Sequence, residues 1–296
     1  MELKKLPDDA GHTLTVLEYK GRWLPDFPRE AIAGMETFEA RKDDVIVCAY
    51  PKSGTHWVWE MVRFLLAGTT DLPVIEKDEA MMEFKLPEHL ENLPSPRPLN
   101  THYHFELLPA DVMRKKCKLV YLTRDPRDVA VSYFHHHKKL VQYYQYGGEW
   151  KDYFHLFLDG QVDYESWFTY TKGWQRGIQA HEGLNIHITS YEELQADTFG
   201  GLQKLANFLG VQVDEALLIQ VVKKCSFDVM RATKGAQEVF GDSDSPIMYR
   251  KGKVGDWKNW FTVAQSEEFD AVFEREMVGT WAYELYSHTK QGSRQT

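Results

Sequence analysis

The stretch AYPKSGTHW, residues 49–57, constrains the fold of this chain more than any other. It joins an uninterrupted apolar run, residues 45–50, to a helix-like run, residues 55–67. A loop between a buried strand and a helix presents backbone N–H groups at the positive end of the helix dipole and can hold a phosphate group. The usual nucleotide loop ends in Gly-Lys-Ser/Thr, whereas here Lys52 precedes Gly54. The sequence therefore predicts an anion site of a different kind.

The side chains of this loop suit a phosphate that is attached to a base. Ser53 and Thr55 add hydroxyl donors, Lys52 adds a mobile point charge, and Trp57 offers an aromatic face for stacking. The alternative is a plain helix N-cap with a solvated lysine beside it, and the loop alone leaves both interpretations open.

Short apolar runs alternate with amphipathic stretches along the rest of the chain. We expect further strands at 118–122 and 185–189, and helices at 127–141, 198–209 and 214–224. Uninterrupted apolar strands that alternate with helices are typical of a parallel sheet covered on both faces. No repeat or Gly/Ser linker divides the sequence, so we predict a single α/β domain over residues 1–296, with a central parallel sheet flanked by helices.

Composition excludes several classes of partner. Acidic residues outnumber basic ones, 44 to 35, and the formal charge is −9. General binding to nucleic acid or to an anionic membrane needs a basic field, so neither is expected. No apolar run reaches the roughly 18 residues of a membrane helix. The N-terminal segment is acidic and has no apolar core region, so no secretory signal is expected. Three scattered cysteines favour free thiols in the cytoplasm over disulfides.

A second cationic motif, LTRDPRDVAVSY, follows the strand at 118–122. It puts Arg124 at the carboxyl edge of the predicted sheet, where ligands of open α/β sheets bind. Asp125 suits the N-cap and Pro126 the first helical position, and Ser132 follows about two turns into the helix. An arginine and a serine at one point suit a second phosphate group. The alternative is a surface ion pair of Arg124 with Asp125 or Asp128.

A third motif, MYRKGKVGDWKNWF, places Arg250, Lys251 and Gly252 in a compact cationic loop. A run of charged residues like this one is usually a solvent-exposed loop that binds no ligand. Three separate phosphate-type motifs in one chain nevertheless favour a ligand that carries phosphate at two separated points.

These motifs match, in order and spacing, those of the cytosolic sulfotransferases: YPKSGTHW at 50–57, RDPRDVAVSY at 124–133 and RKGKVGDWK at 250–258. The chain resembles that family over about residues 17–284. The resemblance implies the P-loop-kinase-like sulfotransferase fold, 3′-phosphoadenosine 5′-phosphosulfate (PAPS) as co-substrate, 3′-phosphoadenosine 5′-phosphate (PAP) as product, and no metal.

The resemblance also implies which residues bind the cofactor. Residues 52–57 would hold the 5′-phosphosulfate, and Arg124, Ser132 and the loop 250–252 the 3′-phosphate. Trp57 and Phe227 would enclose the adenine. The full implied set is Lys52, Ser53, Gly54, Thr55, His56, Trp57, Arg124, Ser132, Tyr191, Cys225, Ser226, Phe227, Met230, Met248, Tyr249, Arg250, Lys251 and Gly252.

By the same resemblance, His102 in LNTHYHF is the general base. Histidine can accept a hydroxyl proton near neutral pH without a metal. Lys52 would stabilise the leaving phosphate oxygen, and Ser132 would hold Lys52 away from it until the acceptor binds. Two residues depart from the family pattern: Asn100 stands where many members have a lysine thought to neutralise charge on the transferring group, and His56 stands where threonine or asparagine is usual.

The implied acceptor is a small hydrophobic phenol, steroid or alcohol, or an amine. Its pocket would be lined by Phe27, Phe84, Asn100, His102 and His136, with Met81, Met82 and Tyr249 as near candidates. The segment 258–267 matches the family's dimer motif, so we expect a homodimer with a small interface through Lys258, Thr262, Val263 and Glu267.

Other functions remain open at this point. A zinc site could use His102 with His104, or residues 135–137, but no carboxylate or cysteine accompanies them, and three consecutive helical residues point about 100° apart. A nucleotide-dependent kinase could use Asp125 or Asp128 for Mg²⁺. A protein that binds PAPS or PAP with weak activity would be consistent with Asn100.

Overall fold

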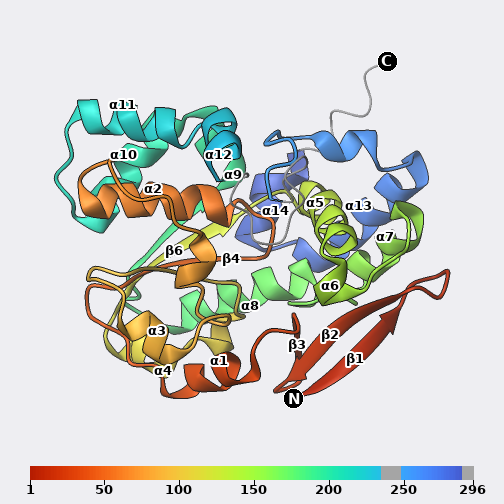
Figure 1. Ribbon diagram of the computed structural model, residues 1–296. Helices are drawn as coiled ribbons and strands as arrows, with labels where there is room; N and C mark the ends of the chain where they lie inside the picture. The colour runs from red at the N-terminus through yellow and green to blue at the C-terminus, as the bar shows by residue number, and fades with distance from the viewer. Residues whose placement is uncertain (235–247, 289–296) are drawn as a thin grey trace.

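The apolar runs predicted as strands form one parallel sheet in the computed structural model, which describes residues 1–234 and 248–288 (Figure 1). The strands stand in the order β5 (Pro98–Thr101), β4 (Val45–Ala49), β6 (Lys118–Thr123) and β7 (Ile186–Ser190). Every residue of β4 is buried, as expected for a strand covered on both faces. The predicted central parallel sheet is confirmed. Residues 235–247 and 289–296 of the predicted domain lie outside the described residues.

Strand β5 was not predicted. Its sequence, PLNT, is short and partly polar, yet Asn100 and Thr101 are fully buried. Asn100 pairs with Val47 of β4, which fixes its position in the sheet.

Helices cover both faces of the sheet. In Figure 1, α2 (Thr55–Ala67), α10 (Thr198–Leu209) and α11 (Glu215–Lys224) lie together on one side and α8 (Trp167–Ala180) on the other. The remaining helices are α1 (Arg29–Gly34), α3 (Pro87–Glu91), α4 (Ala110–Arg114), α5 (Pro126–Lys139), α6 (Val141–Tyr144), α7 (Trp150–Leu158), α9 (Tyr191–Ala196), α12 (Phe227–Thr233), α13 (Val263–Met277) and α14 (Trp281–Tyr286). Short 3-10 helices are η1 (Met35–Thr37), η2 (Lys77–Ala80), η3 (Phe105–Leu107) and η5 (Asp256–Asn259). Across residues 1–234 and 248–288, no helix has the length and apolarity needed to cross a membrane.

Helix α5 begins as its sequence indicates. The Asp125 carboxylate accepts a hydrogen bond from the Arg127 N–H at 2.9 Å, and Pro126 opens the helix. The helix ends at Lys139, short of the predicted end at 141, because Leu140 (φ −87°, ψ 56°) leaves the helical conformation.

A second, antiparallel sheet lies apart from the first and was not predicted. It consists of β1 (Glu2–Pro7), β2 (Thr13–Tyr19) and β3 (Arg22–Leu24). The Tyr164 N–H donates to the Trp23 carbonyl at 2.7 Å and ties this sheet to the segment before α8.

The carboxyl ends of β4, β6 and β7 meet at one edge of the central sheet. The loop 50–54 follows β4, Arg124 follows β6, and Tyr191 follows β7. Ligands of open α/β sheets bind at such an edge, so the fold gathers the predicted phosphate motifs where a ligand can reach them.

Candidate active site

A cavity of about 390 Å³ opens at this edge of the sheet. Its volume is typical of a small-molecule site. Its wall brings together most of the predicted cofactor residues: Lys52, Gly54, Thr55, His56, Trp57, Arg124, Ser132, Tyr191, Cys225, Ser226, Phe227, Met230, Met248, Tyr249, Arg250, Lys251 and Gly252. Ser53 is fully buried just behind this wall.

The loop after β4 has the backbone of an anion cradle. Lys52 (φ 68°) and Gly54 (φ 104°) both adopt positive φ, which turns the chain sharply into α2. A Cβ at Gly54 would lie 2.8 Å from Tyr191 Cδ2, so only glycine fits here without a shift. The hydroxyls of Ser53 and Thr55 are buried and lack a hydrogen-bond partner within the described residues. Buried donors of this kind fit a bound anion.

The ammonium of Lys52 lies against His136. Its Nζ is 3.3 Å from His136 Nδ1 and 3.3 Å from Met248 Sδ. His136 follows Ser132 by one turn of α5, and both line the cavity. Burial, followed by the nearby Lys52 charge, lowers the pKa of His136 well below its usual value, so the imidazole is neutral and can accept from Lys52.

A buried network holds His136 from behind. Tyr144 Oη lies 3.4 Å from His136 Nε2 and donates to Asp163 Oδ2 at 3.1 Å. The other Asp163 oxygen lies 2.6 Å from His137 Nε2. The sequence predicted His136 as an acceptor-pocket residue but gave no signal for this network.

Arg124 joins two loops of the site. Its guanidinium donates to the Lys52 carbonyl at 3.0 Å and to the Lys253 carbonyl at 3.3 Å, and lies 4.4 Å from the Tyr191 ring centre. Its Nε is buried without a hydrogen-bond partner in the described part of the chain, which again fits an anion.

The two acidic residues near Arg124 serve the fold. Asp125 caps α5, and Asp128 accepts from the N–H groups of Gly255 at 2.6 Å and Trp257 at 3.0 Å. Neither forms an ion pair with Arg124 in residues 1–234 and 248–288, so the surface-pair alternative for Arg124 is not observed. Both carboxylates are engaged with backbone, which disfavours the Mg²⁺ role of a kinase.

Ion pairs and a hydrogen bond fix the position of the loop 250–252. Arg250 and Lys251 both pair with Asp256, each at 2.7 Å. Although burial alone would raise the pKa of Asp256, hydrogen bonds from Lys251, Asn259 and Arg250 lower it to about 2. Gln195 Nε2 donates to the Gly252 carbonyl at 2.7 Å. Gly252 (φ 62°) lies so close to the Phe227 ring that a Cβ would collide with it.

Aromatic and sulfur-containing side chains line the neighbouring wall. The Trp57 and Tyr191 rings lie 5.4 Å apart, edge to face, and Phe227 and Met230 face the same cavity. Cys225 is buried here, and burial raises the pKa of its thiol, so it is protonated and a poor nucleophile.

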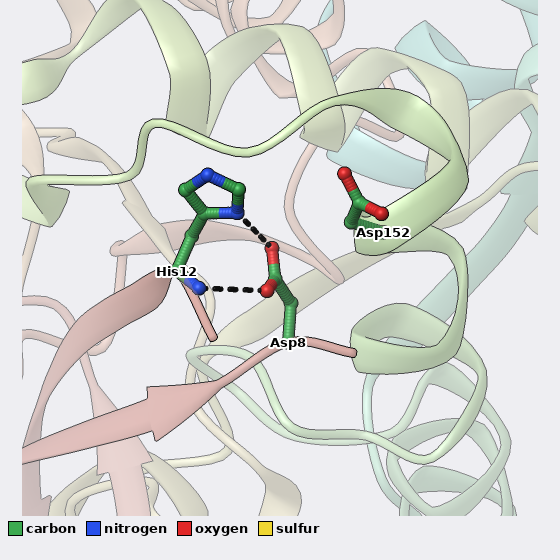
Figure 2. Close-up of side chains that lie close together, drawn as sticks. All are labelled: Asp8, His12 and Asp152. Carbon is green, nitrogen blue, oxygen red and sulfur yellow. Dashed lines mark hydrogen bonds and ion pairs between the residues drawn. The ribbon is translucent and has the colours of Figure 1, made fainter. Parts of the chain in front are cut away.

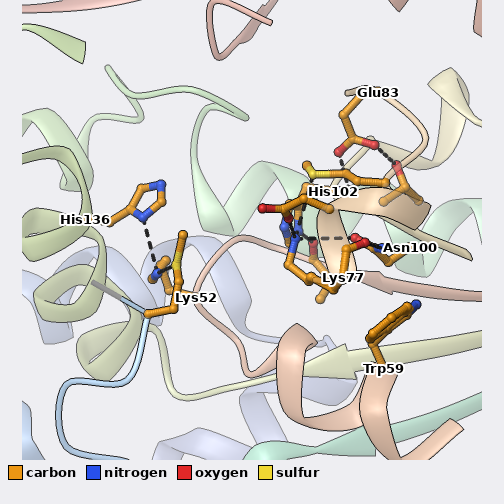
Figure 3. Close-up of polar contacts among 12 residues, drawn as sticks. Lys52, Trp59, Lys77, Glu83, Asn100, His102 and His136 are labelled. Carbon is orange, nitrogen blue, oxygen red and sulfur yellow. Dashed lines mark hydrogen bonds and ion pairs between the residues drawn. The ribbon is translucent and has the colours of Figure 1, made fainter. Parts of the chain in front are cut away.

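The ring of His102 is held in one orientation. Its Nδ1 lies 2.7 Å from the Ala49 carbonyl, which only accepts, so Nδ1 carries the proton and Nε2 carries the lone pair. Its backbone N–H donates to Glu83 Oε1 at 2.7 Å (Figure 3). Burial and then the positive charge of Lys77 lower the pKa of His102 to about 3, so the imidazole is neutral at physiological pH.

The far end of the cavity is aromatic. The Phe27 ring lies 5.0 Å from the Phe84 ring and 6.5 Å from the Tyr143 ring. Of the predicted acceptor residues, Phe27, Phe84, His102, His136, Met81 and Tyr249 line the wall. Met82 is fully buried outside the wall, and Asn100 lies behind Lys77.

Several wall residues escaped the sequence reasoning: Lys77, Asp78, Leu140, Tyr143, Tyr144 and Asp163. A Lys-Asp pair in an irregular segment looks like solvated surface, and nothing in the sequence places η2 against β5.

His56, which the sequence left unexplained, lies in the cavity wall. Its ring lies 6.1 Å from the Tyr249 ring, edge to face. Burial, followed by the charges of Lys77 and Lys52, lowers the pKa of His56 well below its usual value, so it is neutral.

Two of the histidines considered for zinc have other polar partners, and His135 packs edge to face against Trp260, with ring centres 4.6 Å apart. His104 Nε2 lies 3.1 Å from the Tyr164 carbonyl, and His137 is bound to Asp163. Among the residues that the structure describes, one trio, Asp8, His12 and Asp152, has ligand-type atoms within 4.8 Å of one another (Figure 2). Asp8 accepts from the His12 and Ala10 N–H groups, and Asp152 takes part in the capping box of α7, so local hydrogen bonding accounts for this trio.

Comparisons with known proteins agree with these features. Residues 42–281 match the family described as "Sulfotransferase domain". Sulfotransferase 1C2 of Homo sapiens is 33% identical over 291 residues, which cover 93% of this chain and 97% of that protein. Sulfotransferase 1B1 of Mus musculus is 36% identical over 263 residues, covering 83% and 86% of the two chains.

Solved structures give the same fold. The crystal structure of mouse sulfotransferase SULT7A1 complexed with PAP superposes with a TM-score of 0.79 at 28% identity, over 94% of this chain and 99% of that one. Retinol dehydratase in complex with androsterone and inactive cofactor PAP has the same fold, with a TM-score of 0.72 at 21% identity over 91% of each chain.

Proposed function

The chain belongs to the sulfotransferase family, and on that premise we propose how it transfers a sulfuryl group from PAPS to a small acceptor. The observation that carries the proposal is a single cavity with a preorganised anion site at one end, a neutral histidine beside it, and an aromatic wall at the other end. Mouse sulfotransferase SULT7A1, crystallised with PAP, has the same fold and supports PAPS as co-substrate and PAP as product.

Residues of the three motifs would bind the donor. The hydroxyls of Ser53 and Thr55, which have no partner within the described residues, suit the 5′-phosphosulfate together with Lys52. Arg124, Ser132 and the loop 250–252 suit the 3′-phosphate, because they place fixed charge at a second point of the cavity. Trp57 and Phe227 supply the apolar faces for adenine.

His102 acts as general base in this proposal. Its Nε2 lone pair accepts the proton of the acceptor hydroxyl as the acceptor oxygen bonds to sulfur. The bond from sulfur to the bridging phosphate oxygen breaks in the same step, and PAP leaves. PAPS itself supplies the activated sulfuryl group.

Lys52 stabilises the negative charge that develops on the departing phosphate oxygen. His136 Nδ1 lies 3.3 Å from the Lys52 ammonium. We assign to His136, together with Ser132, the task of restraining Lys52 until the acceptor is present.

The acceptor binds between Phe27, Phe84, Met81 and Tyr143. These apolar side chains favour a small hydrophobic molecule that carries a hydroxyl group, such as a phenol, steroid or alcohol, or an amine. Methionine adapts to irregular shapes, which suits several acceptors.

We assign a homodimer contact to an exposed segment that includes the start of α13. Lys258, Thr262, Val263 and Glu267 are all exposed, and Val263 is 77% exposed. A contact made by such a short segment is smaller than a typical stable protein–protein interface. We also place the protein in the cytoplasm as one domain over residues 1–296, in keeping with three buried, unpaired cysteines.

A transfer assay with sulfur-labelled PAPS tests the function. We expect label to move to at least one member of a panel of phenols, sterols, alcohols and amines, also in the presence of EDTA. The His102→Ala variant should bind PAP without transferring label. Tight PAP binding by the unaltered protein with no transfer to any acceptor would contradict the enzyme and favour a binding protein.

A further inference from the structure

Lys77 places a second ammonium group in the cavity wall, separate from that of the half-buried Lys52 (Figure 3). The residue is only 4% exposed. Its Nζ lies 2.6 Å from Asp78 Oδ1, 3.4 Å from Asn100 Oδ1 and 3.7 Å from Met81 Sδ. A buried charge is costly unless it is paired, and the contact with Asp78 supplies that pair while the ammonium stays in the cavity wall.

Asn100 holds Lys77 at both its backbone and its side chain. Asn100 Nδ2 donates to the Lys77 carbonyl at 2.7 Å, while Asn100 Oδ1 accepts from the ammonium. Asn100 is fixed in turn by its pairing with Val47 in the sheet. The neutral side chain of Asn100 therefore anchors a cation that comes from η2.

The third contact of the ammonium is the weak one. A thioether is a poor hydrogen-bond acceptor, so an oxygen in the cavity can displace Met81 Sδ without breaking the pairs with Asp78 and Asn100. Met81 also lines the wall on which we place the acceptor.

We propose that the Lys77 ammonium stabilises negative charge on the acceptor oxygen while His102 removes the proton of the acceptor hydroxyl. One lysine then acts at each oxygen that exchanges at sulfur: Lys77 at the attacking oxygen and Lys52 at the leaving oxygen. Lys77 keeps its proton throughout, and His102 takes the one that is released. The proposal rests on the proposed sulfuryl transfer. It explains how a site with Asn100 at this strand position retains a positive charge.

The surroundings of His102 agree with this assignment. The charged groups that act on His102 are Lys77 and Asp78 of η2 and Lys52 of the loop after β4. The other titratable groups beside it are His56 of α2, His136 of α5, Glu83 and Tyr164, whose ring centre lies 5.6 Å from that of the imidazole. Lys77 is the largest single charge that keeps the pKa of His102 low, and Asp78 opposes it. Removing the Lys77 ammonium should therefore raise the pKa of His102 as well as remove the stabilisation of the acceptor oxygen.

The test compares Lys77→Met, Lys77→Arg and the double variant Lys77→Met/Asn100→Lys with the unaltered protein. We expect Lys77→Met to lower kcat by about 10- to 100-fold, with the Kd of PAP changed by less than about twofold. The arginine variant, or a lysine at position 100, should recover part of the rate because either restores a cation near the same oxygen. Lys172→Met, which breaks the 2.7 Å pair of Lys172 with Glu276 outside the cavity, is the matched control and should leave kcat unchanged.

A titration of His102 by NMR gives a readout that does not need turnover. Lys77→Met should raise the pKa of His102, and the acid limb of kcat/KM should move to higher pH with it. An unchanged rate together with an unchanged His102 titration in a folded Lys77→Met protein would overturn the proposal. If the unaltered protein transferred no sulfuryl group, the proposed function would fail, and the titration would still decide whether Lys77 acts on His102.

Discussion

The two ends of the cavity are built in different ways. The end at which we propose that the donor binds, here called the donor end, is built mainly from segments that follow strands: the loop 50–54 after β4, Arg124 after β6 and Tyr191 after β7. The acceptor end draws single residues from distant segments, among them Phe27, Lys77 of η2 and Tyr143 of α6. The donor end is thus fixed by backbone geometry, whereas the acceptor end depends on how separate segments pack.

This difference separates two kinds of specificity. At the donor end, positive φ at Lys52, Gly54 and Gly252 shapes the main chain around one ligand. At the acceptor end, Phe27, Phe84 and Met81 line the cavity from positions outside the named strands. We therefore expect substitutions at the two ends to affect different constants.

The largest effect is expected where the two ends meet, at His102. His102→Ala should lower kcat by about 10²- to 10⁴-fold, because the Nε2 lone pair is lost. The Kd of PAP should stay within about twofold. Because the pKa of His102 is lowered to about 3, the unaltered free protein keeps this base neutral from pH 8 down to about pH 4. Single-turnover rates measure the effect of His102→Ala, and an NMR titration of the unaltered protein measures the pKa of His102. A His102→Ala rate within about threefold of the original would refute the base assignment.

The donor end is tested by Gly54→Ala. The new methyl group would lie 2.8 Å from Tyr191 at φ 104°, so the loop must shift, and we expect the Kd of PAP to rise by about tenfold or more. Gly68→Ala is the matched control, because Gly68 (φ 66°) has nothing within 4 Å of the added Cβ. It should cost about 1 kcal/mol of unfolding free energy and leave PAP binding unchanged. Calorimetric titration and thermal unfolding separate strain from lost binding.

The difference between the two ends also explains which parts of the site the sequence predicts. Three of the four central strands and helix α2 were predicted within about one residue, because buried strands are apolar throughout and α2 starts at a glycine turn. The donor residues of the loop 50–54, Arg124 and Tyr191 followed, since each lies within a few positions of a predicted strand end. Residues 225–230 and 248–252 lie far from any predicted strand, so strand positions gave no indication of them. Strand β5 was missed because two of its residues, Asn100 and Thr101, are polar although fully buried.

The acceptor end could not be read in this way. Lys77 and Asp78 look like a solvated charge pair until β5 places Asn100 against them. Asp163 and Tyr144 reach the cavity only because both contact the histidines of α5. Tertiary packing of this kind leaves no local pattern.

The acceptor end is tested by Phe84→Ala. Loss of the ring that lies 5.0 Å from Phe27 removes part of the apolar wall, and we expect the KM of a phenolic acceptor to rise by about tenfold. The Kd of PAP and the affinity for the donor should be unchanged. An equal loss of PAP affinity would show that the two ends of the cavity are coupled and would contradict the expectation that they control different constants.

The smallest effect on activity is expected from Val263→Glu at the start of α13. Val263 is 77% exposed and follows Thr262, whose side chain caps the helix by accepting from Gln265 N at 3.2 Å, so the fold tolerates the change. We expect sedimentation velocity to show a dimer becoming a monomer, because the added carboxylate cannot be desolvated in a small contact. Both kcat and the Kd of PAP should stay within about twofold, since Val263 lies outside the cavity wall. A variant that remained dimeric would place the interface elsewhere, and a monomer with weakened PAP binding would show that the loop 250–252 depends on the partner for its position.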